Sequence, residues 1–317
     1  MSEYPKLKLP DNTRLFTEHT DKALAKKIDP NFRYAYFKTI AKGGKSLIQS
    51  CKDMQLNRVV CYKSLLAEFA EDPIEQKRLL REARVSAMLQ HPNTVPTYEL
   101  GRNNKGHYYF TMKLVHGYTL REIFDYRERY DLSQLVDIII QVARALDCAH
   151  SHGVIHRDIK PENILIGPYG EVLLLDWGLA KVWDKNGDQS RLEEEPPDHS
   201  IEDPTMTGHQ KLQGTLFYMS PEQIERDPAI DSRTDIYSLG VVLYEALTGR
   251  TPAEGELTDD VIQSILKDEP PKPSDLAPGV PPLLENTAMK CLDKNRENRV
   301  QTAAELIRSL QQNLALV

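Results

Sequence analysis

One short stretch of this chain brings three kinds of functional side chain together at fixed offsets. The segment from His156 to Asn163 reads His-Arg-Asp-Ile-Lys-Pro-Glu-Asn and supplies a carboxylate, an amine and a carboxamide. The apolar, strand-like run 171–175 follows it, and Asp176-Trp177-Gly178 ends that run with a second carboxylate. Phosphoryl transfer from a nucleotide needs such a set: a base, a cation and oxygen ligands for magnesium. A lone Asp or Asn in a loop is usually a turn residue, so it is the spacing that favours catalysis over turn chemistry.

Length and composition are those of a globular protein. A chain of 317 residues suits one large domain or two lobes packed together. Its 40% apolar and 27% charged residues lie well away from the composition of disordered chains. The net charge of −7 argues against nucleic acid as the main partner, because phosphate backbones bind basic surfaces.

The cysteines and the N-terminus indicate a cytoplasmic location. Cys51, Cys61, Cys148 and Cys291 are scattered without a Cys-x-x-Cys pair, which favours reduced thiols over disulfides or a metal site. The first residues contain no apolar core that would serve as a signal peptide. No run approaches the roughly 18 apolar residues of a membrane span. We therefore expect a soluble protein with no membrane span.

The character of the sequence changes twice along the chain. Residues 1–33 are polar and proline-containing, and they predict an extension with one short helix at 21–27. Short strand-like runs follow at 34–40, 47–51, 58–64, 96–100 and 108–114, interrupted by a helix at 73–89. Beyond residue 115 the pattern is mostly helical, with apolar-faced helices at 133–151, 231–248 and 303–314.

These motifs and this order of elements resemble the eukaryotic-type serine/threonine protein kinases, most closely their bacterial members. The resemblance covers about residues 34–310. It implies an α+β, bilobal protein-kinase fold: a small β-rich N-lobe with one regulatory helix at 34–112 and a larger, mainly helical C-lobe at 113–317, after the extension 1–33. It also implies a signalling enzyme that transfers the γ-phosphoryl of ATP to Ser or Thr hydroxyls of protein substrates, with Mg²⁺, or Mn²⁺ in its place, as cofactor.

The resemblance gives each polar residue of the central motif a role. Asp158 would orient the substrate hydroxyl and accept its proton, and Lys160 would neutralise charge on the γ-phosphoryl. Asn163 and Asp176 would ligate magnesium. The run Lys160-Pro-Glu-Asn163 is the serine/threonine form of this loop.

Lys63 and Glu82 form a second candidate pair. Lys63 ends the run Val-Val-Cys-Tyr on a predicted strand, and Glu82 lies nineteen residues later on the predicted helix. By resemblance, Lys63 would hold the α- and β-phosphates of ATP and Glu82 would be its ion-pair partner. Taken singly, Lys63 would be an edge-strand lysine and Glu82 a solvated helix residue.

The loop that covers the phosphates departs from the family pattern. The family carries three glycines here, whereas Ala41 and Ser46 stand at the first and third positions and only Gly43 is retained. Ala and Ser are the mildest replacements for glycine, so we expect ATP binding to persist, with Lys42 and Lys45 adding positive charge. The nucleotide-binding segment by resemblance comprises Ile40, Ala41, Lys42, Gly43, Gly44, Lys45, Ser46, Leu47 and Ile48.

Further residues are assigned to the adenine pocket by the same resemblance. Met112 would lie at its back, and the backbone groups of Lys113 and Val115 would bond the adenine edge. The ring would be sandwiched by apolar side chains, namely Ile40, Ile48, Cys61 and Leu165. Each of these residues, taken alone, is more typical of a plain core than of a ligand contact.

The stretch from Asp176 to Glu222 resembles the activation segment of the family. Thr205 and Thr207 are candidate autophosphorylation sites whose phosphates Arg157 would pair with, although either threonine also suits a turn. Thr215 would contact Asp158 and Lys160 at the substrate-docking end. Glu222 would pair with Arg299, and Asp235 would hold the backbone of the catalytic loop.

Two other functions compete with this interpretation. The altered glycine loop suggests a pseudokinase that holds nucleotide without turnover, but Lys63, Glu82, Asp158, Asn163 and Asp176 are all present. A small-molecule phosphotransferase related to aminoglycoside kinases would share the Asp and Asn of the loop. Lys160 and Thr215 disfavour it, because they are typical of peptide-directed kinases. The sequence predicts no oligomeric state.

Overall fold

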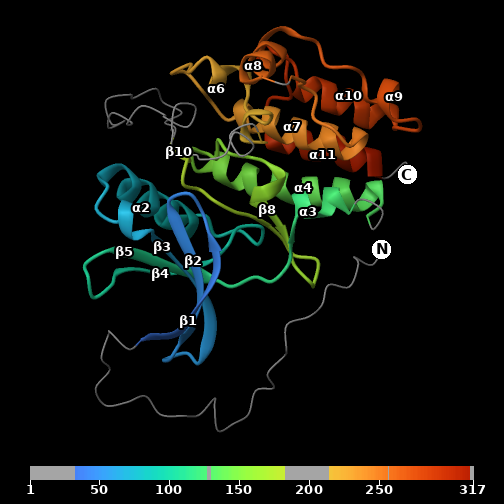
Figure 1. The fold of residues 1–317 in the computed structure, drawn as a ribbon. Coiled ribbons are helices and arrows are strands. Elements are labelled where there is room, and N and C mark those ends of the chain that lie inside the picture. The colour runs from blue at the N-terminus through green and yellow to red at the C-terminus, as the bar shows by residue number, and fades with distance from the viewer. Residues whose placement is uncertain (1–32, 127–129, 183–213, 256, 315–317) are drawn as a thin grey trace. The chain divides into compact units, whose positions relative to one another are not determined.

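The computed structural model describes residues 33–126, 130–182, 214–255 and 257–314 (Figure 1). Contacts divide this part of the chain into two compact units. The N-terminal unit comprises 33–90 and 95–116, and the C-terminal unit comprises 91–94 and 117–314. The boundary between the units falls after residue 116, and the segment 91–94 belongs to the C-terminal one. The helix expected at 21–27 lies outside the described residues.

The N-terminal unit contains a five-stranded antiparallel sheet with strand order β1-β2-β3-β5-β4. All five strands predicted from the sequence are confirmed, and their ends differ from the prediction by at most two residues. The strands are β1 (Tyr34–Lys42), β2 (Ser46–Asp53), β3 (Arg58–Leu65), β4 (Thr97–Arg102) and β5 (Tyr108–Lys113).

One helix, α2 (Pro73–Met88), packs on this sheet after the short 3₁₀ turn η2 (Ala67–Phe69). Asp72 caps it by accepting hydrogen bonds from the backbone N–H groups of residues 74 and 75 at 2.8 and 3.2 Å. Pro73 occupies the first helical turn, where its missing N–H costs no bond. The buried side chains of Leu79 and Ala83 pack against Phe110 of β5, which fixes the helix on one face of the sheet.

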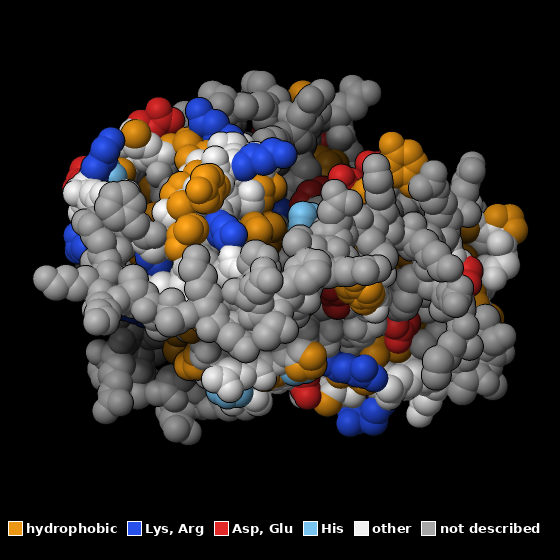
Figure 2. Space-filling view, turned by 90° about the horizontal axis from the view of Figure 1, so that it is seen from below, with side chains coloured by type: hydrophobic (Ala, Val, Ile, Leu, Met, Phe, Trp, Pro, Cys, Tyr) orange, Lys and Arg blue, Asp and Glu red, His pale blue; other side chains and the backbone are white. Residues whose placement is uncertain are grey.

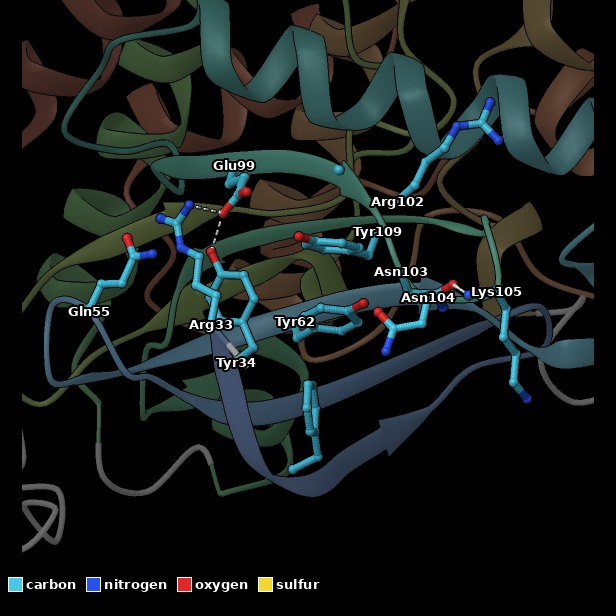
Figure 3. A pocket seen from close by; sticks show the side chains of 12 residues that line it. Arg33, Tyr34, Gln55, Tyr62, Glu99, Arg102, Asn103, Asn104, Lys105 and Tyr109 are labelled. Carbon is cyan, nitrogen blue, oxygen red and sulfur yellow. Dashed lines mark hydrogen bonds and ion pairs between the residues drawn. The ribbon is translucent and has the colours of Figure 1, made fainter. Parts of the chain in front are cut away.

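The opposite face of the sheet carries a cluster of tyrosines that sequence analysis did not single out. The rings of Tyr62 and Tyr109 are stacked at 4.5 Å, and Tyr34 meets both edge-on at 6.0 Å. Figure 3 shows these rings lining a pocket, with the Arg33–Glu99 ion pair at one side. In that pair the nitrogen and oxygen are 2.7 Å apart, and the Tyr34 hydroxyl donates to the same Glu99 carboxylate.

Replacing Tyr34 with Phe is expected to destabilise the fold by about 1 kcal/mol, the net worth of one part-buried hydrogen bond. The ring stays, but the hydroxyl that bonds Glu99 and lies 3.3 Å from Thr111 Oγ1 is lost. Urea unfolding of both proteins measures the difference. Tyr169→Phe is the matched control, because that ring is 69% exposed. Equal midpoints for the two variants would contradict the prediction.

The C-terminal unit is mainly helical, and its predicted long helices are confirmed. Its helices are α3 (Leu120–Asp125), α4 (Leu132–Ser151), α6 (Pro221–Ile224), α7 (Arg233–Thr248), α8 (Thr258–Lys267), α9 (Pro273–Leu276), α10 (Pro282–Cys291) and α11 (Ala303–Leu314). Its described residues also form short strands and a 3₁₀ turn: β6 (Tyr118–Thr119), β7 (Val154–Ile155), η4 (Pro161–Asn163), β8 (Ile164–Ile166), β9 (Val172–Leu174) and β10 (Lys181–Val182).

Helix α7 is the centre of this unit. It is buried from Thr234 to Leu247, and α4 and α10 pack against it, with α11 packed on α4 (Figure 1). Gly240 permits the close approach of α10, because a Cβ atom there would lie 2.4 Å from the Cβ of Cys291. Gly249 ends the helix with φ of 82°, a left-handed conformation that glycine adopts without strain.

The segment 91–94 belongs to the C-terminal unit although it lies between elements of the other one. The Asn93 amide donates to Gln141 Oε1 at 3.1 Å and to the Val172 carbonyl at 2.8 Å. Its own carbonyl accepts from the Leu174 N–H at 2.9 Å. These bonds attach the segment to α4 and to β9.

Within the described residues, no helix is both long and apolar enough to cross a bilayer. Figure 2 shows hydrophobic side chains at the surface among lysines and arginines. All four cysteines lie in the described residues and are free thiols, as the scattered spacing predicted.

Candidate active site

Lys63 and Glu82 form the ion pair that the sequence predicted. The register places Lys63 of β3 opposite Ile48 of β2 and Phe110 of β5, on the sheet face that packs against α2. The Lys63 Nζ lies 2.6 and 2.7 Å from the two carboxylate oxygens of Glu82. Both residues are 7% exposed, so the ammonium is held at a fixed point of the sheet.

The altered glycine loop forms a tight hairpin between β1 and β2. Ala41 pairs with Ile48 and Lys42 with Leu47, and the Gly43 N–H donates to the Ser46 carbonyl at 2.9 Å. Lys42 is exposed, whereas the Lys45 ammonium lies 3.0 Å from the carboxylate of Glu75. The positive charge expected from Lys45 is therefore largely offset by a neighbour in α2.

Several residues assigned to the adenine pocket share one face of the sheet. Cys61 lies two residues before Lys63 on β3, so both side chains point to the α2 side of the sheet. Their cross-strand partners, Met112 for Cys61 and Ile48 for Lys63, lie on the same side. Burial raises the pKa of the Cys61 thiol to about 11, which keeps it neutral. Of the other residues assigned to the adenine pocket, Ile40 is exposed on β1. Lys113 ends β5 and Val115 follows two residues later, whereas Leu165 is half-buried in β8.

A buried carboxylate fixes the backbone of the catalytic-loop motif. Asp235 of α7 accepts from the backbone N–H groups of His156 and Arg157, both at 2.9 Å, and from the His150 ring at 2.9 Å. Burial alone would raise the pKa of Asp235, but these hydrogen bonds hold it below its ordinary value. Arg157 has φ of 69°, a strained conformation that such bonds can maintain.

Asp158 lies in a network of donors from the same loop. Its carboxylate oxygens are 2.8 and 2.9 Å from Lys160 Nζ, and Asn163 Nδ2 donates to one of them at 2.8 Å. Lys160 also donates to the Thr215 hydroxyl at 3.1 Å. Burial raises the pKa of Asp158; the Lys160 charge opposes this shift and the Asp176 carboxylate adds to it.

Asn163 and Asp176 stand at the same end of the β8–β9 hairpin. Ile164 pairs with Leu174, and the next N–H along, that of Leu175, donates to the Asn163 carbonyl at 2.8 Å. Since the Asn163 amide nitrogen is used to hold Asp158, its oxygen is the atom left to act as a ligand. Asp176 is exposed and has φ of 60°. A carboxylate and an amide oxygen form the hard donor set that Mg²⁺ prefers.

His156, which had no predicted role, lies between the catalytic-loop motif and the residues around Asp176. Its Nε2 lies 2.9 Å from the Leu175 carbonyl, so that nitrogen carries the proton. Its Nδ1 then accepts from the Asp158 N–H at 3.2 Å, and its ring lies 4.5 Å from that of Trp177. The sequence feature that could have identified His156 was its position directly before Arg157 and Asp158.

Similarity to known proteins identifies the family of this chain. A protein kinase domain model matches residues 34–310. This chain belongs to the protein kinase family. It is 37% identical to the serine/threonine-protein kinase PknD of Protochlamydia amoebophila, over 89% of this chain and 30% of the relative. It is 36% identical to the serine/threonine-protein kinase PknB of Mycolicibacterium smegmatis, over 86% of this chain and 42% of the relative. The chain thus spans less than half the length of these relatives.

The expected ion pair between Glu222 and Arg299 is also formed. Arg299, 1% exposed, donates to both carboxylate oxygens of Glu222 at 2.6 and 2.8 Å. Ser220 caps α6, the short helix that contains Glu222. Ser238 of α7 donates to the Tyr218 carbonyl at 2.7 Å. The candidate phosphorylation sites Thr205 and Thr207 lie outside the described residues.

Proposed function

We propose that this kinase domain transfers the γ-phosphoryl of MgATP to Ser and Thr hydroxyls of proteins. The observation that carries the proposal is the Asp158 network, in which a buried carboxylate is held by Lys160 and Asn163 beside Thr215. The relatives are named serine/threonine-protein kinases, which supports the class of acceptor.

Asp158 and Lys160 are proposed to act on the reacting groups. The Asp158 carboxylate would accept a hydrogen bond from the substrate hydroxyl, orient it and take its proton as the oxygen attacks. Lys160 would neutralise charge on the moving phosphoryl while its bond to Thr215 keeps the ammonium in place. Because the loop is fixed by Asp235, this arrangement needs little reorganisation during the reaction.

The nucleotide and the metal are proposed to be held by the predicted residues. Asn163 and Asp176 would hold Mg²⁺, with Mn²⁺ as an alternative ion; when bound, the ion offsets the negative charge of the triphosphate. Lys63, fixed by Glu82, would hold the α- and β-phosphates. The β1–β2 hairpin would cover the phosphates, and Ile48, Cys61, Met112 and Leu165 would contact the adenine.

The regulatory assignments are proposals as well. Thr205 and Thr207 are proposed autophosphorylation sites whose phosphates would pair with Arg157. We place the activity in the cytoplasm, because it consumes ATP, and in signalling, because it would modify proteins.

A competition between acceptors tests the proposed function. The purified protein is incubated with MgATP labelled at the γ-phosphate, together with dephosphorylated casein and an aminoglycoside. Label on Ser and Thr of casein or of the protein itself is the expected result. Label on the aminoglycoside would favour the small-molecule phosphotransferase. Binding of ATP with no label transferred would favour the pseudokinase, which the comparisons do not support.

The rate is expected to depend on pH through Asp158. A base is active when deprotonated, so kcat/KM should fall as the pH falls through the pKa of this carboxyl. Because burial raises that pKa, the fall should begin at a higher pH than for an ordinary aspartate. Replacing Lys160 with Met removes the charge that opposes the rise in the pKa of Asp158, so kcat/KM should begin to fall at a still higher pH. A fall at the same pH in both proteins would contradict the assignment of Asp158 as the base.

A further inference from the structure

The pocket on the sheet face opposite α2 has no part in the mechanism above. It encloses about 720 Å³, and every residue that lines it belongs to the N-terminal unit. Its lining includes the stacked rings of Tyr62 and Tyr109, the ring of Tyr34 edge-on to both, and Phe37 (Figure 3). A pocket of this volume that is lined by aromatic rings and a few polar groups is typical of a site for a small organic ligand.

Two buried hydroxyl groups of this pocket form no hydrogen bond with any described residue. Tyr62 is 7% exposed and Tyr109 is 9% exposed, yet both hydroxyl oxygens remain accessible to solvent. The Tyr109 hydroxyl lies over Gly101 of β4, where a Cβ atom would be only 2.8 Å from it. Burial raises the pKa of both phenols, so each keeps its proton. Both hydroxyls are therefore available as donors to a ligand.

The charges of the lining favour an anionic ligand over a cationic one. Glu99 is already used, because it accepts from the Tyr34 hydroxyl and lies 2.7 Å from Arg33. Three cationic side chains and this one carboxylate give the lining a formal charge of +2, on a chain whose net charge is −7. The Arg102 guanidinium donates to the backbone of its own turn at 2.9 Å. Lys105, in the same turn, is exposed and pairs with no described carboxylate.

We propose that this pocket binds a small aromatic carboxylate. Its ring would lie against the aromatic side chains, where Phe37 presents a partly exposed ring 5.1 Å from that of Tyr62. Its oxygen atoms would accept hydrogen bonds from the two free phenols, and its charge would be offset by Lys105. The site lies within one unit and does not depend on the proposed kinase activity.

An NMR titration of the full chain with 6-hydroxy-2-naphthoate tests the inference. This probe carries oxygen acceptors at both ends of a planar ring system. Wild type should bind it with a Kd of about 1 mM or tighter, as expected for a ligand of this size. 2-Naphthol, which lacks the carboxylate, should bind at least about tenfold more weakly. Tyr62→Phe and Tyr109→Phe keep the rings, and each should weaken binding of the naphthoate by about three- to tenfold, the contribution of one hydrogen bond.

The controls locate the site and separate charge from ring contacts. Lys105→Met should weaken binding of the naphthoate but not of 2-naphthol, and this exposed position tests the site even if loss of a phenol disturbs the fold. Tyr169→Phe, 69% exposed in the C-terminal unit, should leave both affinities unchanged.

Three results would overturn the inference. The first is no saturable binding of the naphthoate to wild type. The second is an affinity that neither the phenylalanine variants nor Lys105→Met changes, because the probe would then bind elsewhere. The third is a particle mass that doubles with concentration in wild type and not in the phenylalanine variants, since the face would then bind a second copy of the chain.

Discussion

Replacing Asp158 with Asn is expected to lower the rate of phosphoryl transfer by about 10²- to 10⁴-fold, the usual contribution of a general base. The amide keeps the size of the side chain and can still accept a bond from Lys160, so the loop should stay folded. It has no carboxylate to take the proton. Initial rates with labelled MgATP, measured with saturating protein substrate, provide the comparison.

Two checks keep this result specific. MgATP should raise the Tm of Asp158→Asn about as much as that of wild type, because the residues proposed to hold the nucleotide are unchanged. Asp125→Asn is the matched control, since this exposed aspartate ends α3 outside the network and its loss should leave the rate unchanged. A variant at Asp158 that retains the wild-type rate would remove this residue from the mechanism.

Replacing Glu222 with Gln is expected to destabilise the fold by about 3–5 kcal/mol, the cost of breaking one partner of a buried ion pair. Arg299 is 1% exposed and would keep its charge with only an amide opposite it. The remaining carbonyl contacts of the guanidinium, to residues 233, 293 and 294, cannot replace the lost charge. Chemical unfolding, with equal m-values verified for both proteins, measures the change.

An exposed pair provides the comparison. Arg250 and Glu254 lie 2.8 Å apart on side chains that are 49% and 62% exposed. Glu254→Gln should therefore change stability by no more than about 1 kcal/mol. Equal effects at positions 222 and 254 would show that burial does not control the strength of the Glu222–Arg299 pair.

Much of the fold follows from local patterns in the sequence. The strands of the N-terminal unit form short strand-like runs in the sequence, so β1 to β5 were predicted to within two residues. Asp72-Pro73 marked the start of α2 by its capping chemistry. The Lys63–Glu82, Glu222–Arg299 and Asp235 contacts were predicted from the resemblance to the protein kinase family, whose short motifs contain these residues.

What the sequence did not predict depends on contacts between distant segments. The bonds of Asn93 to α4 and β9, and the tyrosine cluster behind the sheet, have no local signature. Lys45 was expected to add charge at the nucleotide, and its pairing with Glu75 thirty residues away was not foreseen. Arg121 of α3 pairs with Glu245 of α7 across 124 positions. Such juxtapositions depend on packing, which periodicity does not specify.

The most direct test of the central claim is a single-turnover measurement. The protein, in excess over MgATP labelled at the γ-phosphate, is mixed with a Ser/Thr peptide substrate and quenched at increasing times. We predict acid-stable label on Ser or Thr hydroxyls, appearing far faster in wild type than in Asp158→Asn. Tight binding of MgATP, seen as a raised Tm, with no label on any hydroxyl would contradict the account and leave a domain that binds nucleotide without turnover.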